Sequence, residues 1–238
     1  MTIAYDAVSS LSFTGDVTAG LWVHTPVGTP KAVIVLVGMN TSLVDQIASV
    51  SYGGVAMTEV SLSPLLGSAG DEDGMVYGYF LGSGIPTGAQ DILVDTTSTA
   101  GKRGVAITCT AAADTAVDTT NTLDAVQANP SLVLATTAST ATFIAAMLHT
   151  GLNAVGDFDK GADYTQLYEN DFGTVCVGAQ YRTTNGAGGN ITVDWVAAGS
   201  DDAHVLAVAI KEAAAAAASK VPVHRYVKSQ AVQRASRW

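Results

Sequence analysis

The sequence is poor in charged residues, aromatic residues and cysteine. Only 13% of its 238 residues are charged and 7% are aromatic, whereas 48% are hydrophobic and 24 are glycine. This composition differs from that of disordered proteins, which are polar and highly charged, and it lacks the strict glycine period of a fibre. A chain of this length can bury roughly 70% of its unfolded surface. We therefore expect a folded protein.

The motifs of common enzymes are also missing. The sequence contains no Gly-x-Ser-x-Gly elbow, no phosphate-binding Gly-x-x-x-x-Gly-Lys-Ser/Thr loop and no dinucleotide-binding glycine motif. Its four histidines are far apart, so none forms a helical zinc pair; they are His24, His149, His204 and His224. We expect each to be an ordinary strand or tail residue, and the protein to be neither an enzyme nor a cofactor carrier. A hydrolase with an unrecognised site is the enzymatic alternative.

Targeting signals and long apolar runs are absent as well. The first ten residues have neither a basic cluster nor an apolar stretch, and the longest aliphatic run is Ala32–Val37. A membrane helix needs about 20 apolar residues. We expect a soluble chain without a signal peptide. Cys109 and Cys176 each lie in an apolar, alternating run, which favours free buried thiols, although a single disulfide is not excluded.

Charge is unevenly distributed along the chain. Residues 1–212 hold 6 basic and 21 acidic residues, a formal charge of −15, whereas residues 213–238 hold five basic residues and no acid. An acidic body repels nucleic acid and anionic lipid, so we expect neither as a partner of the body. Only the basic end could contact phosphate, and it could equally bind an acidic neighbour.

The body alternates apolar and polar residues with a period of two, which is typical of β-strands. Gly, Asn, Asp and Pro separate the runs, and Gly53-Gly54 predicts a two-residue hairpin. Asp118–Ala128 is the only candidate for a short helix, and it is ambiguous; no internal repeat is visible in the sequence. The thirteen predicted strands are Ser9–Phe13, Gly20–Thr25, Lys31–Gly38, Ile47–Tyr52, Val55–Leu62, Met75–Leu81, Ala89–Val94, Arg103–Thr110, Ser131–Thr137, Thr142–His149, Val175–Arg182, Asn190–Val196 and His204–Lys211. So many short strands predict an all-β fold, a two-sheet sandwich.

The character of the chain changes near Ala213. Six alanines, Ala213 to Ala218, predict a short helical or frayed spacer, and isolated apolar residues mixed with basic ones follow. We therefore divide the chain into a β-sandwich body, residues 1–212, and a basic C-terminal docking arm, residues 213–238. We expect the arm to fold on binding a partner, with a solvated tail as the alternative. Its predicted partner-binding residues are Lys220, Arg225, Tyr226, Lys228, Arg234, Arg237 and Trp238.

Acidic loops and aromatic residues are the remaining candidates for a binding site. Asp71, Glu72 and Asp73 on a predicted loop are a candidate calcium site, although solvated charge is the simpler interpretation. Two further loops carry Asp157, Asp159 and Asp163, and Asp201 with Asp202. Tyr164 and Tyr168, with Tyr181, could line a face that binds carbohydrate, whereas Trp22 and Trp195 lie in alternating strands and are predicted to be buried.

Three segments carry a resemblance to a known family. They are KAVIVLVGM at Lys31–Met39, IASVSYGGVAMTEV at Ile47–Val60 and AHVLAVAIKEA at Ala203–Ala213. In this pattern a strand ends in Tyr-Gly-Gly, the next begins with a small apolar residue followed by Met and Thr, and a late strand reads His-x-x-Ala-Val-Ala-Ile. The body, residues 9–212, resembles the jelly-roll-like β-sandwich of virion structural proteins of tailed bacteriophages; the arm lies outside the resemblance.

The resemblance implies a role in building a particle, without catalysis. Our leading hypothesis is a virion structural protein, either a capsid decoration protein or a minor tail protein, that forms homo-oligomers or many-copy arrays. Its partners would be other virion subunits or copies of itself, contacted through the arm. The alternative is a carbohydrate-binding module or host-receptor adhesin that binds a surface glycan. The resemblance transfers no active-site residue.

Overall fold

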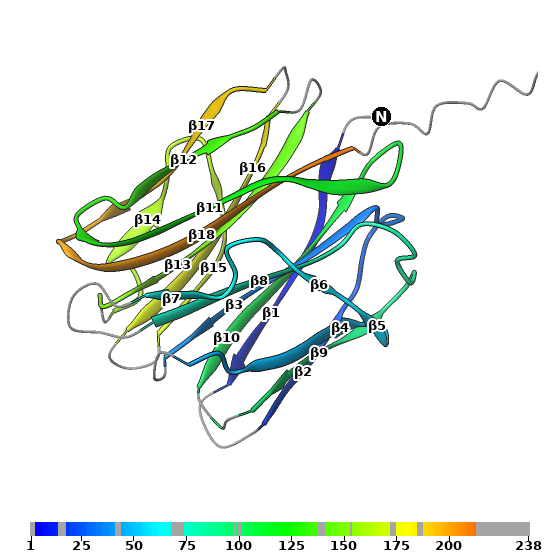
Figure 1. Ribbon diagram of the computed structural model, residues 1–238, viewed down its shortest axis with the longest axis horizontal. Coiled ribbons are helices and arrows are strands. Elements are labelled where there is room, and N and C mark those ends of the chain that lie inside the picture. Colours follow the sequence, from blue (N-terminus) through cyan, green and yellow to red (C-terminus); the bar gives the residue numbers. More distant parts are fainter. Residues whose placement is uncertain are drawn as a thin grey trace, which may run out of the picture.

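The structure, a computed structural model, describes residues 3–13, 18–40, 44–67, 74–97, 99, 101–137, 141–152, 154–171, 175–184 and 188–212. These residues form eighteen β-strands and no helix (Figure 1). No helix that could cross a membrane occurs in this part of the chain. The all-β prediction is confirmed.

The strands divide among four antiparallel sheets, which we call sheets A to D. Sheet A has the order β1 (Ala4–Phe13), β10 (Lys102–Thr110), β3 (Ala32–Met39), β8 (Gly74–Leu81) and β6 (Thr58–Glu59), with β7 (Leu65–Gly67) also paired to β8. Sheet B has the order β2 (Ala19–His24), β9 (Gln90–Thr96), β4 (Ile47–Tyr52) and β5 (Val55–Ala56). Sheet C has the order β11 (Thr115–Gln127), β18 (Asp201–Glu212), β13 (Thr142–Thr150), β16 (Cys176–Thr184) and β15 (Thr165–Asp171). Sheet D has the order β12 (Ser131–Ala135), β17 (Asn190–Ala197) and β14 (Phe158–Lys160).

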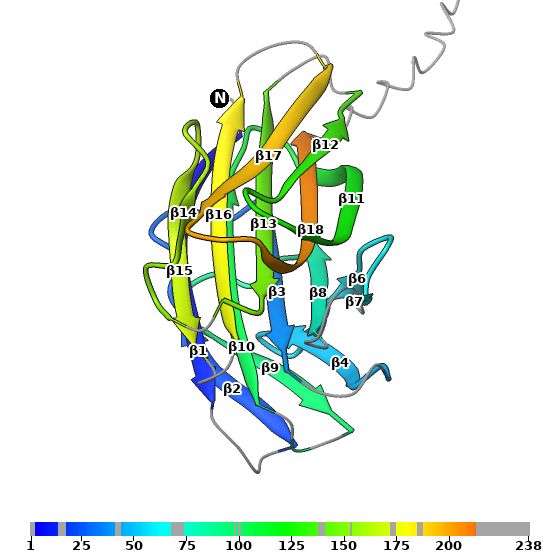
Figure 2. The same ribbon diagram turned by 90° about the vertical axis from the view of Figure 1, so that its left-hand side faces the viewer.

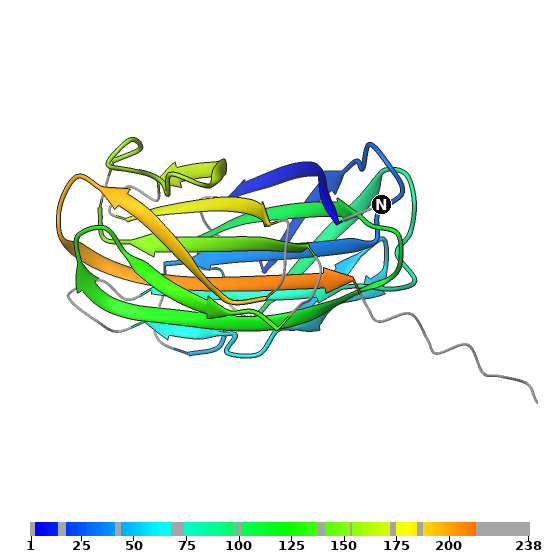
Figure 3. The same ribbon diagram turned by 90° about the horizontal axis from the view of Figure 1, so that it is seen from above.

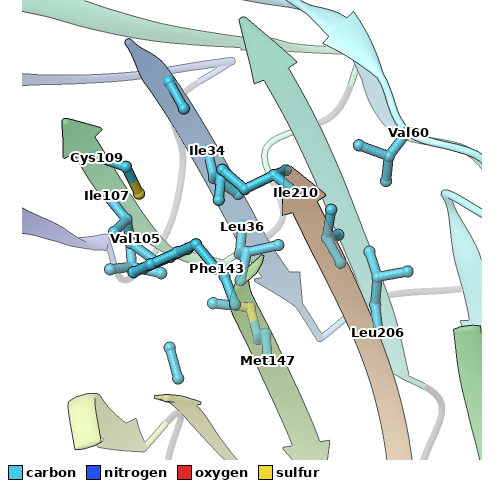
Figure 4. Close-up of a cluster of buried hydrophobic side chains, with 14 of the residues drawn as sticks. Ile34, Leu36, Val60, Val105, Ile107, Cys109, Phe143, Met147, Leu206 and Ile210 are labelled. Atoms are coloured by element: carbon cyan, nitrogen blue, oxygen red, sulfur yellow. The ribbon is translucent and has the colours of Figure 1, made fainter. Parts of the chain in front are cut away.

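The sheets are stacked in the order B, A, C, D, with a hydrophobic core between each neighbouring pair. Sheets B and D lie at opposite ends of the molecule (Figures 1 and 2). Sheets A and C meet in the middle, where side chains of β3, β8 and β10 pack against those of β13 and β18 (Figure 4). The strands of sheet C lie side by side along the long axis (Figure 3).

The two middle sheets are buried on both faces. Every residue of β3 is buried; Ile34 and Leu36 point into the central core, and Val33 and Val35 point into the core between sheets A and B. A strand with two apolar faces reads as a continuous hydrophobic run, which explains the aliphatic run at Ala32–Val37. The prediction of two sheets is therefore wrong in number, because it assumed that each sheet has one solvated face.

We call β1–β10 the first half of the chain and β11–β18 the second half. The strand pairing within each half is nested, so that the first strand pairs with the last, the second with the last but one, and the third with the last but two. In the first half β1 pairs with β10, β2 with β9, β3 with β8 and β4 with β5. In the second half β11 pairs with β18, β12 with β17 and β13 with β16. Sheet C thus repeats the strand order of sheet A, and sheet D repeats that of sheet B. The sequence shows no internal repeat, but the strand topology does repeat.

The repeat extends to the register of the strands. The first strand of each half carries an irregularity, between Tyr5 and Ala7 in β1 and between Val117 and Thr119 in β11, and the skipped residue is aspartate in both, Asp6 and Asp118. Counted along the ladders from these bulges, paired positions of β1, β10 and β3 have equivalents in β11, β18 and β13. Cys109 corresponds to Ile210, Ala32 to Phe143, Ile34 to Ala145, Leu36 to Met147, Gly38 to His149 and Arg103 to His204.

All thirteen predicted strands overlap observed ones, and the Gly53-Gly54 hairpin is confirmed. Both glycines have positive φ, 55° and 77°, as such a turn requires, and Tyr52 pairs with Val55 across it. The helix candidate Asp118–Ala128 is wrong, because this segment is the greater part of β11 and pairs along its length with β18. Its side chains are mostly half-buried, so no clear alternation marked it as a strand. Besides β11, three strands were not predicted: β7, β14 and β15.

Candidate functional site

Two groups of predicted site residues lie outside the described residues. The first is the arm, with Lys220, Arg225, Tyr226, Lys228, Arg234, Arg237 and Trp238; the second is the calcium candidate Asp71, Glu72 and Asp73. Strand β18 ends at Glu212, next to the predicted boundary of the arm. The arm, its boundary and the calcium site stay predictions.

The other acidic loop residues do not converge on a metal site. Asp157 accepts a hydrogen bond from the backbone N–H of Ala154, and Asp159 accepts one from Lys160. Asp163 instead forms an ion pair with Arg182, at 3.1 Å between Oδ2 and Nη1. Among the residues that the structure describes, no three His, Cys, Asp or Glu side chains are grouped as metal ligands.

The three tyrosines proposed to line a sugar-binding face do not share one. Tyr164 is buried and donates a hydrogen bond to the carbonyl of Thr192. Tyr181 stacks between Tyr5 and Phe143, with ring centroids 4.6 and 5.3 Å away. Tyr168 donates to the carbonyl of Leu11. The prediction of a common tyrosine platform is therefore wrong, whereas Trp22 and Trp195 are buried as predicted.

Both cysteines are free and buried, as the sequence favours. Cys109 lies in the central core and Cys176 in the core between sheets C and D, so the two thiols occupy different layers and do not pair. Burial raises the pKa of the Cys176 thiol to about 12 and that of Cys109 well above its ordinary value. Since the thiolate is the reactive form, neither cysteine has the environment of a nucleophile.

Two of the histidines that are far apart in sequence are neighbours in the structure. His149 on β13 lies directly opposite His204 on β18, with ring centroids 5.6 Å apart, and both are buried. His204 Nδ1 lies 2.8 Å from Oδ1 of Asp124 on β11. Desolvation, with the nearby His204 second, lowers the pKa of His149 to about 3, so this ring is neutral near pH 7.

This histidine pair lies where sheet C meets the edge of sheet A. A Cβ added at Gly67 of β7 would lie 2.0 Å from Nδ1 of His204, and one added at Gly74 of β8 would lie 2.2 Å from Nδ1 of His149. The two glycines therefore leave the space that the imidazoles occupy. The histidine pair of the second half is therefore buried against β7 and β8 of the first half.

An arginine occupies the equivalent position in the first half. Arg103 of β10 is only 2% exposed, and its Nε and Nη2 donate hydrogen bonds of 2.6 Å each to Asn170 Oδ1 and the carbonyl of Asp171 in β15. Burial lowers its pKa, while Tyr168 and Asp171 oppose that shift. Arg103 therefore ties sheet A to the edge of sheet C, a structural role rather than a catalytic one.

A serine and a histidine approach one another at the seam between β1 and β2. Ser9 Oγ lies 2.8 Å from His24 Nδ1 and accepts a hydrogen bond from Trp22 Nε1, while His24 Nε2 lies 3.1 Å from Thr108 Oγ1. His24 is fully buried. The equivalent seam in the second half is bridged by Asn121, whose Nδ2 donates to the carbonyl of Val133. Asn121 occupies the position in β11 that Ser9 occupies in β1. We therefore interpret the hydrogen bonds of Ser9 and of Asn121 as links between adjacent sheets.

A concave polar surface lies at the end of β14. This pocket of about 360 Å³ is lined by Ala162, Asp163, Arg182, Asn190, Ile191, Thr192 and Asp194. The guanidinium of Arg182 is held between the Asp163 carboxylate and the ring of Tyr164, 5.8 Å from the ring centroid. We call it the Arg182 pocket. It combines a cationic donor, two carboxylates, an amide and a hydroxyl.

The pocket exists because β14 is short. Strand β14 pairs with β17 only at Trp195, Val196 and Ala197, so the earlier part of β17 has no strand beside it there. Side chains take the place of the missing strand: Tyr164 donates to the carbonyl of Thr192, and Gln180 Nε2 donates to that of Asp194, each at 2.9 Å. Since Gln180 is fully buried, the rim of the pocket is fixed in place.

A pocket in the first half of the chain lies at the corresponding strand. It has a volume of about 440 Å³, and its lining residues are Val23, Gly53, Gly54, Ala89, Gln90 and Asp91, next to the first residues of β9. Here β4 continues to Tyr52 and β5 follows, and no basic residue lines the pocket. Of these two pockets, the Arg182 pocket contains an ion pair and the pocket beside β9 does not.

Sequence reasoning named two residues of this region, Asp163 and Tyr164, but not Arg182, Asn190, Thr192 or Asp194. No local signal marks them, because the pocket forms only when the turn after β14 meets β16 and β17. Comparisons of the chain with protein-family models, with curated proteins and with solved structures find no match.

Proposed function

We propose that this protein is a non-enzymatic virion structural protein of a tailed bacteriophage, a capsid decoration or minor tail protein that attaches to the particle through residues 213–238. We also propose that each half of the body is a jelly roll. The nested strand pairing supports this finer description, because a jelly roll is a long hairpin rolled into two Greek keys, with its first strand beside its last.

One observation carries the structural role: two halves of the same topology pack face to face and share the central core. Several buried polar side chains join strands and sheets. Arg103 links β10 to β15, and Asp124 contacts His204. Such a body is suited to bearing load in an assembly.

Purified particles provide the test. We expect the chain to co-sediment with intact phage particles released from cells that encode it, and an antiserum against residues 1–212 to label those particles in electron micrographs. We further expect the full-length chain to form a homo-oligomer, and a chain ending at Glu212 to be monomeric with an unchanged melting temperature. Recovery of the chain only in the particle-free fraction would contradict the proposal.

A second candidate function, binding of a surface glycan, is favoured by a specific observation. The Arg182 pocket is open, polar and held in shape by buried hydrogen bonds before any ligand arrives. Pre-organisation of this kind lowers the entropic cost of binding a polar ligand. Saturable binding on a glycan array, lost when Arg182 is replaced, would establish this function independently of the particle.

A further inference from the structure

We infer that the Arg182 pocket binds a neutral sugar, a ligand with several neighbouring hydroxyl groups and no formal charge. This inference rests on the glycan-binding candidate function and is independent of the proposed role in a particle.

The polar groups of the pocket match the chemistry of sugar hydroxyls. The carboxylates of Asp163 and Asp194 only accept hydrogen bonds, the guanidinium of Arg182 only donates them, and the side chains of Asn190 and Thr192 do both. A hydroxyl group donates and accepts, so neighbouring hydroxyls of one ring can satisfy donors and acceptors together. A ligand that only donates or only accepts would leave part of this set unsatisfied, which is costly.

The charge of the surroundings excludes acidic sugars. The pocket has two carboxylates against one guanidinium, and Asp163 already contacts that guanidinium. The body as a whole carries 21 acidic and 6 basic residues. An anionic ligand would therefore meet repulsion both inside the pocket and during its approach. A sugar without formal charge avoids this repulsion, so the neutral class of sugars fits best.

The geometry of Arg182 favours recognition of paired hydroxyls. Its contact with Asp163 and its position over the Tyr164 ring restrict the rotation of a long side chain. A planar guanidinium with a fixed orientation can donate two parallel hydrogen bonds to adjacent oxygens, which a lysine cannot do. The tyrosine ring itself is only 4% exposed, so it supports Arg182 and does not stack on the ligand.

The test compares neutral and acidic glycans on the full-length protein. We would apply it to an array of oligosaccharides containing glucose, galactose, mannose or N-acetylglucosamine, together with others containing uronic or sialic acid, and then titrate the best neutral ligand by calorimetry. We expect saturable binding of neutral glycans only, at least tenfold weaker in Arg182→Ala and in Asp194→Asn. Arg182→Lys keeps the charge but not the paired donors, and we expect a similar loss.

The first half of the chain supplies the matched control. Asp91→Asn changes a carboxylate in the corresponding pocket, and we expect affinity to change by less than twofold. Preference for acidic glycans, lost in Arg182→Ala, would overturn the neutral class but leave the glycan function standing. Neutral binding that survives both Arg182 variants in correctly folded protein would overturn the assignment to this pocket. Absence of saturable binding would overturn this inference and the glycan function together, without bearing on co-sedimentation with particles.

Discussion

The two halves of the chain share one strand order and one register, yet they meet through different side chains. At two pairs of equivalent positions in the central core a small residue in one half corresponds to a large one in the other, Ala32 to Phe143 and Ala145 to Ile34. Complementary sizes fill a shared interior without voids. The two halves therefore share their backbone pairing, while the side chains that pack between them differ.

The polar contacts at the rims of the central interface differ in the same way. The first half contributes Arg103, which reaches β15, whereas the second half contributes His204, with His149 and the half-exposed Asp124. A guanidinium stays charged at any accessible pH, while an imidazole does not. Equivalent positions therefore hold a guanidinium in one half and an imidazole in the other.

The largest effect is expected when the size difference in the central core is removed. Phe143→Ala gives the second half the residue that the first half has at Ala32. Because Phe143 is fully buried, we expect a loss of about 3–5 kcal/mol in the free energy of unfolding, measured by urea denaturation. Leu21→Ala on the solvated face of sheet B, where Leu21 is 54% exposed, is the control and should change stability by less than about 0.5 kcal/mol. A loss under 1 kcal/mol for Phe143→Ala would show that the core is loosely packed.

The next effect concerns the arginine link. Arg103→Met removes the donors to Asn170 and to the carbonyl of Asp171, and we expect a loss of about 2–3 kcal/mol because two hydrogen bonds from a buried, charged guanidinium are lost. Arg182→Met changes an arginine whose side chain is 31% exposed and should cost less than about 1 kcal/mol. Equal losses in the two variants would contradict the assigned role of Arg103.

A smaller effect separates the two bulge aspartates. The Asp118 carboxylate accepts hydrogen bonds from Thr137 and from Lys211 Nζ, the latter at 2.7 Å, whereas Asp6 accepts from Gly28 N and Thr108 Oγ1. Since charge-assisted contacts are stronger, we expect Asp118→Asn to cost about 2 kcal/mol and Asp6→Asn about 1 kcal/mol. Thermal denaturation of both variants measures the difference, and the reverse order would refute it.

The smallest effect is the pH dependence of stability that His149 contributes. The folded state lowers the pKa of His149 to about 3, so the unfolded chain binds a proton more readily, and stability falls as the pH drops below about 6.5. The groups facing this ring are His204 and, through it, Asp124. Between pH 7 and pH 5.5 we expect this site to contribute a loss of about 1 kcal/mol, and His149→Leu to remove that part of the dependence. An unchanged slope in His149→Leu would show that other groups titrate.

Several features were predictable because they depend on short stretches of chain. Two adjacent glycines specify a tight hairpin whatever surrounds it, and apolar flanks indicate a buried thiol at Cys109 and at Cys176. Strand β11 was not predictable from its own residues, because its half-buried edge position leaves no alternation to detect. The number of sheets was misjudged for a related reason, since a run such as Ala32–Val37 indicates burial but not how many layers provide it.

The candidate site shows the same limit. Arg182 lies within a predicted strand, but nothing in that strand indicates a pocket. The pocket forms because β14 ends early and leaves part of β17 without a neighbouring strand. His149 and His204 are separated by much of the second half, and the ladder between β13 and β18 alone brings them together.

The sequence by itself determined that this protein is built from strands, where its tight turns fall and which segments are buried, because those properties follow from the residues of each segment. The tertiary structure alone decided the repeated topology, the partners of Arg103 and His204, and the Arg182 pocket. Antiparallel pairing joins residues distant in sequence, and one strand carries no local signal that identifies its neighbour.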